Sequence, residues 1–277
     1  MRKTMQIIYR TLYIVVALLL LVSCESNDNL IEEQESIEVQ FTTTLPQELQ
    51  TRSYGNADYV DILYVQVYDT EGNELMKKSF PTFKSGFDFS IEMAKNQTYK
   101  IVFWAQHAEC NVYDISDMKS IKMNSDILVA KDFKAVEQMD AFYATTTIDT
   151  STKPTIHSVD LVRPLAQVNV GTTIKEVSNE KAKFTISNAS TIFHPFDGDV
   201  SKDDKKEMIF EFLVTNDKEL EVEDIKYNYL VMGYFFASPK GELLDCELTL
   251  EGASKNTFSD VSFQANKRTN IVGTFTN

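Results

Sequence analysis

The fold class is decided by the stretch YKIVFWAQ, residues 99–106. It is rich in β-branched and aromatic residues, and its apolar residues form an almost unbroken run. Such a composition favours a β-strand, and an unbroken apolar run of this length is typical of a strand that is covered on both faces. The sequence therefore predicts a central, buried strand at this position.

Segments on both sides of this run alternate apolar and polar residues with a period of two. In the first of them, Ile37, Val39 and Phe41 are each followed by a polar residue. This pattern predicts a strand with one face on a core. The same pattern, or a related apolar run, recurs at residues 63–68, 87–93, 140–144, 159–171, 184–186, 208–213, 227–237, 244–250, 258–263 and 270–275. No heptad or long amphipathic helix competes with it, so the predicted fold class is all-β.

The number of strands predicts the domain organisation. About a dozen strands in roughly 240 residues are typical of two tandem antiparallel β-sandwich domains. We place their boundary at Arg163-Pro164, because proline cannot donate a hydrogen bond to a ladder and marks an edge or a crossing point. The predicted domains are residues 37–163 and 164–277. Residues 111–138 are more polar and mixed, and we expect a long excursion with a helical turn there.

The N-terminus has the features of an export signal. Arg2, Lys3 and Arg10 precede an apolar run over residues 12–22, which is too short to cross a bilayer as a stable helix. These features predict a secretory signal peptide over residues 1–23. The stretch LVSC at 21–24 resembles a bacterial lipobox, so Cys24 is predicted to become the lipidated first residue, with an incidental cysteine as the alternative. The polar, acidic residues 24–36 would then form a tether.

Composition and charge exclude some classes of function. Basic residues number 27 and acidic residues 41, which gives a formal net charge of −14. A chain this acidic repels the phosphates of nucleic acid, so we expect no nucleic-acid partner. The sequence also contains no nucleophile elbow, P-loop, HExxH, CxxC or GxGxxG motif. We therefore predict no enzyme activity, no cofactor and no bound metal.

Single residues that could carry chemistry have more ordinary interpretations. His107, His157 and His194 fall in different predicted elements, and Cys110 and Cys246 in different predicted domains, which favours free thiols over a disulfide. The Asp69 and Glu71 turn, like the acidic loop at 197–204, lacks the full ligand series for calcium. For the aromatic residues Trp104, Tyr227, Tyr229 and Tyr234 we favour packing in the core. A platform that binds sugar is the alternative.

Four stretches then occur in a characteristic order. They are Thr51-Arg52 with VDILYVQVYD at 60–69 and Gly72, then YKIVFWAQ at 99–106, LVRPLAQVNVG at 161–171 and NKRTNIVG at 266–273. Together with the lipobox they resemble the Bacteroidetes fimbrillin superfamily, the lipoprotein precursors of protease-assembled pili. The resemblance is greatest to a fimbrillin-like branch often catalogued only as a domain of unknown function. It implies two tandem transthyretin-like β-sandwich domains.

The resemblance also implies a mode of assembly. The precursor is lipidated, moved to the outer membrane and cut after an arginine by a trypsin-like protease, which removes the first strand of the N-terminal domain. A strand from another subunit then fills the groove. On this sequence the removable strand covers residues 37–44, including Ile37, Val39 and Phe41, and the cut falls between Arg52 and Ser53. Arg52 is the only arginine between residues 11 and 162; an ordinary loop arginine is the alternative.

The resemblance has one departure and leaves the role open. Polymerising subunits of the superfamily carry C-terminal donor strands, whereas only residues 274–277 follow Gly273 here. A tip, accessory or shaft subunit of a pilus, or an adhesin, is expected at the outer membrane. Its partners would be other fimbrillin subunits and a host or bacterial surface receptor. The alternative is a non-polymerising surface lipoprotein that binds a carbohydrate or another ligand.

Overall fold

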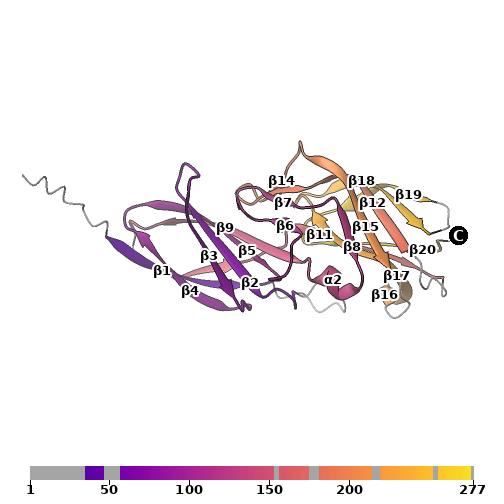
Figure 1. The fold of residues 1–277 in the computed structure, drawn as a ribbon, viewed down its shortest axis with the longest axis horizontal. Helices are drawn as coiled ribbons and strands as arrows, with labels where there is room; N and C mark the ends of the chain where they lie inside the picture. Colours follow the sequence, from indigo (N-terminus) through magenta and orange to yellow (C-terminus); the bar gives the residue numbers. More distant parts are fainter. Residues whose placement is uncertain are drawn as a thin grey trace, which may run out of the picture. The chain divides into compact units, whose positions relative to one another are not determined.

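The computed structural model describes residues 35–46, 57–152, 156–174, 181–213, 219–251 and 255–275. Strands and their connections make up nearly all of these residues, which confirms the predicted all-β class (Figure 1). The predicted lipidation and cleavage residues, Cys24, Arg52 and Ser53, lie outside the described residues. Among the described residues, no helix is both long enough and apolar enough to cross a membrane.

Two sheets are built from the first part of the chain. The sheet ordered β10-β1-β4 contains β1 (Ser36–Thr44), β4 (Phe87–Ala94) and β10 (Ile156–Asp160). The sheet ordered β3-β2-β5-β9 contains β2 (Ile62–Tyr68), β3 (Glu74–Pro81), β5 (Thr98–Gln106) and β9 (Ala141–Asp149). The pairs of the second sheet are antiparallel, but β1 and β10 run parallel.

Three further sheets include the second part of the chain. The sheet β16-β17-β11-β20 contains β11 (Leu165–Thr172), β16 (Glu219–Val222), β17 (Ile225–Phe236) and β20 (Arg268–Gly273). The sheet β19-β18-β12-β15-β8 contains β8 (Ile127–Ala130), β12 (Lys181–Ser190), β15 (Lys205–Leu213), β18 (Glu242–Leu250) and β19 (Asn256–Phe263). The small sheet β14-β13-β7-β6 contains β6 (Tyr113–Asp114), β7 (Ile121–Met123), β13 (Ile192–His194) and β14 (Asp199–Val200).

The predicted excursion at 111–138 contains more structure than its sequence indicates. The expected helical turn is present as α2 (Phe133–Glu137), and the Asp132 carboxylate caps it by accepting from the Ala135 N–H at 2.8 Å. The strands β6, β7 and β8 were not predicted, because two to four residues are too few to show a periodicity. Two of them pair with strands far along the chain, β7 with β13 and β8 with β15.

Strand β5 has the central position predicted from its unbroken apolar run. Ile101 and Phe103 point into a first core, the buried cluster around Phe41, Phe103 and Phe142. Val102 and Trp104 point to the opposite face, into a second core that also holds Phe210 and most buried residues after position 164. Because successive side chains of a strand point to opposite faces, both sets must be apolar here. The prediction of a strand covered on both faces is confirmed.

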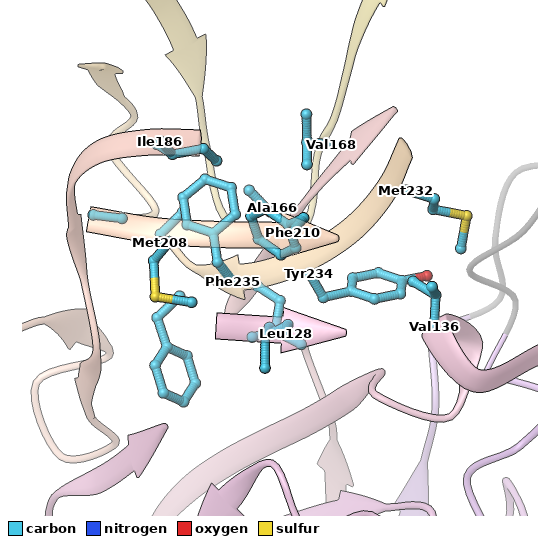
Figure 2. Close-up of a cluster of buried hydrophobic side chains, with 14 of the residues drawn as sticks. Leu128, Val136, Ala166, Val168, Ile186, Met208, Phe210, Met232, Tyr234 and Phe235 are labelled. Carbon is cyan, nitrogen blue, oxygen red and sulfur yellow. The ribbon is translucent and has the colours of Figure 1, made fainter. Parts of the chain in front are cut away.

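The second core joins elements that are distant in sequence. Figure 2 shows Leu128 of β8 and Val136 of α2 near Phe210 of β15 and Tyr234 of β17. Residues 113–137 therefore contribute to the same core as the strands after the predicted boundary. The interruption at Arg163-Pro164 is present, since β10 ends at Asp160 and β11 begins at Leu165. The division into two domains at this point stays a prediction.

Candidate functional site

The candidate functional site is the position of β1 between β10 and β4, which we call the β1 seat. Gln40 pairs with Ile156 and Thr44 with Asp160 in parallel register with β10. The Thr44 carbonyl accepts from the Leu161 N–H at 2.8 Å, and on the other side the Thr43 carbonyl accepts from the Gly86 N–H at 2.9 Å. Because β1 has partners along both edges, its loss would leave two rows of unpaired backbone groups.

The inward face of β1 fills the first core. Val39, Phe41 and Thr43 are at most 2% exposed, and the half-buried Ile37 packs against the same cluster. The outward residues Glu38 and Gln40 are exposed. The structure thus has the alternation that the sequence predicts for this strand. Removal of the strand stays a prediction.

Phe41 is the largest side chain that β1 inserts. Its ring centroid lies 5.3 Å from Phe89 of β4, 5.6 Å from Phe103 of β5 and 5.7 Å from His157 of β10. Burial of a side chain of this size contributes about 1.5–3 kcal/mol. Without β1, the seat would expose an aromatic pocket that only another side chain of similar size could fill.

Side chains on the outward face of β1 form hydrogen bonds with both neighbouring strands. The Thr42 hydroxyl donates to Asp88 Oδ1 at 2.6 Å, and the Thr44 hydroxyl donates to Asp160 Oδ1. The Ser90 hydroxyl donates to Glu38 Oε1 at 2.5 Å.

The sequence did not identify the residues of β4 and β10 that form these hydrogen bonds with β1. They are Asp88, Ser90 and Asp160. These residues lie 46 to 116 positions from their partners, and the strand order that brings them together cannot be read from the sequence. The one available signal was the alternation of polar residues in the β4 segment.

A shallow depression of about 370 Å³ opens on this face of the seat. Residues of all three strands line it: Gln40, Phe41, Thr42, Asp88, Phe89, Ser90 and Ile156. The exposed Ile156 provides an apolar surface, and the hydroxyl and carboxylate groups provide hydrogen bonds.

The predicted cleavage site lies in the link between β1 and β2. Between Arg10 and Lys77, Arg52 is the only basic residue of the sequence. After the link, the Asp61 N–H donates to the Gln106 carbonyl at 3.1 Å. A trypsin-like protease therefore has one sequence site at which it can separate β1 from β2.

The predicted boundary residue Arg163 forms a buried ion pair. Its Nε donates to Asp140 Oδ1 at 2.7 Å, and its second terminal nitrogen donates to Asp140 Oδ2 at 2.8 Å. Its guanidinium also donates to Asn266 Oδ1 at 3.2 Å and lies 4.7 Å from the centroid of the Phe142 ring. Burial raises the pKa of Asp140, and the guanidinium opposes that shift. The pair ties the β9 region to the turn before β20.

The three histidines do not come together. His107 contacts the Tyr59 carbonyl at 3.0 Å through Nδ1, His157 lies beside Phe41, and His194 Nδ1 is 3.3 Å from the Lys119 carbonyl. In the part of the chain that the structure describes, no group of three or more His, Cys, Asp or Glu side chains could hold a metal ion. The carboxylate of Asp69 accepts from the Glu71 and Asn73 backbone N–H groups of its own turn.

The thiols and the aromatic residues of the candidate sugar platform are buried or partly buried in the second core. Cys110 and Cys246 are free, and burial raises the pKa of the Cys110 thiol to about 11 and that of Cys246 to about 12. Trp104 and Tyr234 are fully buried, and Tyr229 is 1% exposed. Tyr227 is partly buried and packs against the same core. Core packing, the favoured interpretation, is confirmed for Trp104, Tyr229 and Tyr234.

Comparison with known proteins shows the family and the fold. The sequence profile described as "Family of unknown function (DUF6562)" matches residues 32–276. No curated protein matches the chain in sequence. A solved structure from Bacteroides thetaiotaomicron, provisionally described as polysaccharide-binding, is 12% identical with a TM-score of 0.52, over 84% of this chain and 90% of its own.

Two further solved structures are provisionally described as adhesins. One, from Bacteroides ovatus, is 10% identical with a TM-score of 0.52, over 92% of this chain and 94% of its own. The other, from Bacteroides thetaiotaomicron, is 12% identical with a TM-score of 0.50, over 80% and 79%. At these identities the likeness shows a shared fold.

Proposed function

Because this chain belongs to the family of unknown function DUF6562, we propose its role from the β1 seat: it is a fimbrillin-like surface lipoprotein that acts as a pilus subunit or adhesin. One observation carries the proposal. An N-terminal strand is paired on both edges and buried in the first core, while its link to β2 offers a single basic residue to a protease. Such a strand can be cut away, and only another strand restores what it provided.

In the proposed pathway, lipidation of Cys24 first anchors the precursor at the outer membrane. A trypsin-like protease cuts between Arg52 and Ser53, and the strand containing Ile37, Val39 and Phe41 leaves. A strand from another fimbrillin subunit then enters the β1 seat. The adhesin descriptions of two proteins with this fold support a role at the cell surface. The proposal applies to a tip, accessory or shaft subunit and includes no catalysis.

Limited proteolysis tests the proposal. Brief trypsin treatment of residues 24–277 should give one stable fragment that begins at Ser53, with the β1 peptide held until it is exchanged. The Arg52→Gln variant should remain uncut in this link, and Arg268→Gln is the matched control. The proposal is overturned if trypsin cuts other loops of the folded chain first and leaves Arg52 intact.

A second candidate function rests on the depression over the β1 seat. Its hydroxyl and carboxylate groups beside the exposed Ile156 suit a carbohydrate, and one protein with this fold is provisionally described as polysaccharide-binding. A bound glycan would raise the melting temperature of the uncut chain, since binding to the native state stabilises it. Ile156→Asp should abolish the shift, and a glycan screen without any shift would reject this candidate.

A further inference from the structure

We infer that Asp88 and Asp160 select the strand that enters the β1 seat, by requiring hydrogen-bond donors at the two outward positions that Thr42 and Thr44 occupy in β1. The inference rests on the proposed strand replacement and adds the chemistry of the partner. It makes these two carboxylates specificity-determining residues of the seat.

The inward face alone specifies little of the partner's sequence. Any strand with alternating apolar residues can place them in the first core. The position of Phe41 is the one that requires a particular kind of side chain, an aromatic ring. The rings of Phe89, Phe103 and His157 surround it. A slip of one residue would turn every inward side chain outward, and a slip of two would move the aromatic side chain out of its pocket.

The outward face supplies the missing selectivity. Thr42 donates to Asp88 at 2.6 Å and Thr44 donates to Asp160. An ionised carboxylate only accepts hydrogen bonds, so both positions favour donors and disfavour acidic side chains. Nearer the N-terminus of β1 the roles of donor and acceptor are exchanged, because Ser90 of the seat donates to Glu38 of β1. The seat therefore offers a donor at one end and two acceptors at the other. This order favours one orientation of the incoming strand as well as one register.

The preferred partner is therefore an extended strand with an inward aromatic residue, which is followed immediately and again two residues later by threonine or serine. In this sequence that pattern occurs in β1, as Phe41-Thr42-Thr43-Thr44, and in β12, as Phe184-Thr185-Ile186-Ser187. Strand β12 is paired with both β15 and β18 and is not free to leave. The partner that the seat selects is thus a strand of another polypeptide that carries this pattern.

Peptide binding to the full chain cut after Arg52 tests the inference. Three labelled peptides of residues 36–44 compete for the seat: the native sequence, Thr42→Val with Thr44→Val, and the control Gln40→Val. Valine keeps the shape of threonine and removes the hydroxyl. Loss of two hydrogen bonds to carboxylates should weaken binding about ten-fold or more, whereas the Gln40 control should stay within about two-fold.

The protein variant Asp88→Ala with Asp160→Ala completes a double-mutant cycle with the double-valine peptide. On this variant the native and the double-valine peptides should bind equally well, because the acceptors are gone from both complexes. If all three peptides bind the unchanged protein equally well, strand replacement stands and the inference is overturned. If no peptide enters the cut chain, the proposed function itself fails, and the inference with it.

Discussion

At the scale of single residues, Phe41 is the largest side chain that β1 buries in the first core. Its ring contacts strands on both sides and beneath. Phe41→Ala should lower the free energy of unfolding by about 3–5 kcal/mol, because the cavity lies inside a close-packed core. Leu75→Ala, at a position that is 54% exposed on β3, should change it by less than about 0.5 kcal/mol. Equal losses in urea unfolding would contradict the assigned role of Phe41.

The buried pair of Asp140 and Arg163 makes a second prediction at this scale. Arg163→Met should cost about 3–5 kcal/mol of stability near neutral pH, because it leaves a buried carboxylate without its partner. The loss should shrink as the pH falls, since a protonated Asp140 carries no charge. The double variant with Asp140→Asn should be more stable than Arg163→Met alone. Additive losses in chemical unfolding would show that the two residues are not coupled.

At the scale of elements, periodicity predicted the long strands and missed the short ones. Strands β1 and β5 have nine residues each, which is long enough for the sequence pattern to indicate whether one face or both faces are buried. Strand β8 has only four residues, and its parallel pairing with β15 joins positions more than 80 residues apart. Likewise, the inward face of the seat was predicted through Val39 and Phe41. Asp88 and Asp160 were not, because their role depends on strand order, which the sequence does not encode locally.

The contact between β15 and β17 gives a prediction about one element against another. A Cβ at Gly233 of β17 would lie 2.3 Å from the ring of Phe210 on β15. Gly233→Ala should therefore destabilise the fold by about 1–3 kcal/mol through overpacking. Adding Phe210→Leu, which removes the ring, should recover part of that loss. Thermal unfolding of the two variants measures the difference, and a tolerated Gly233→Ala would contradict this packing.

At the scale of the whole molecule, the two cores do not follow the order of the chain. The sheet containing β5 contributes to both of them. Residues 113–137 belong with the later strands although they precede the predicted boundary. The predicted boundary was placed at the proline interruption. The structure has an interruption there, between β10 and β11, while the boundary itself stays a prediction. Sequence reasoning had no signal for a segment that crosses to a distant partner.

The predicted anchor gives a test on cells. Cys24→Ser should move the protein from the membrane fraction to the soluble fraction, because an acyl chain contributes about 0.8 kcal/mol for each buried CH₂ group. Ser23→Ala, next to the lipidated residue, is the matched control and should fractionate like the parent. Unchanged fractionation of Cys24→Ser would refute lipidation and leave the β1 seat untouched.

The central claim is that β1 is removed and replaced when the protein assembles. The most direct measurement is to map the N-terminus of the protein in purified cell-surface assemblies and to search the same material for the β1 peptide. We predict a terminus at Ser53 and no peptide covering residues 37–44. Assemblies in which every copy still carries those residues would contradict the claim.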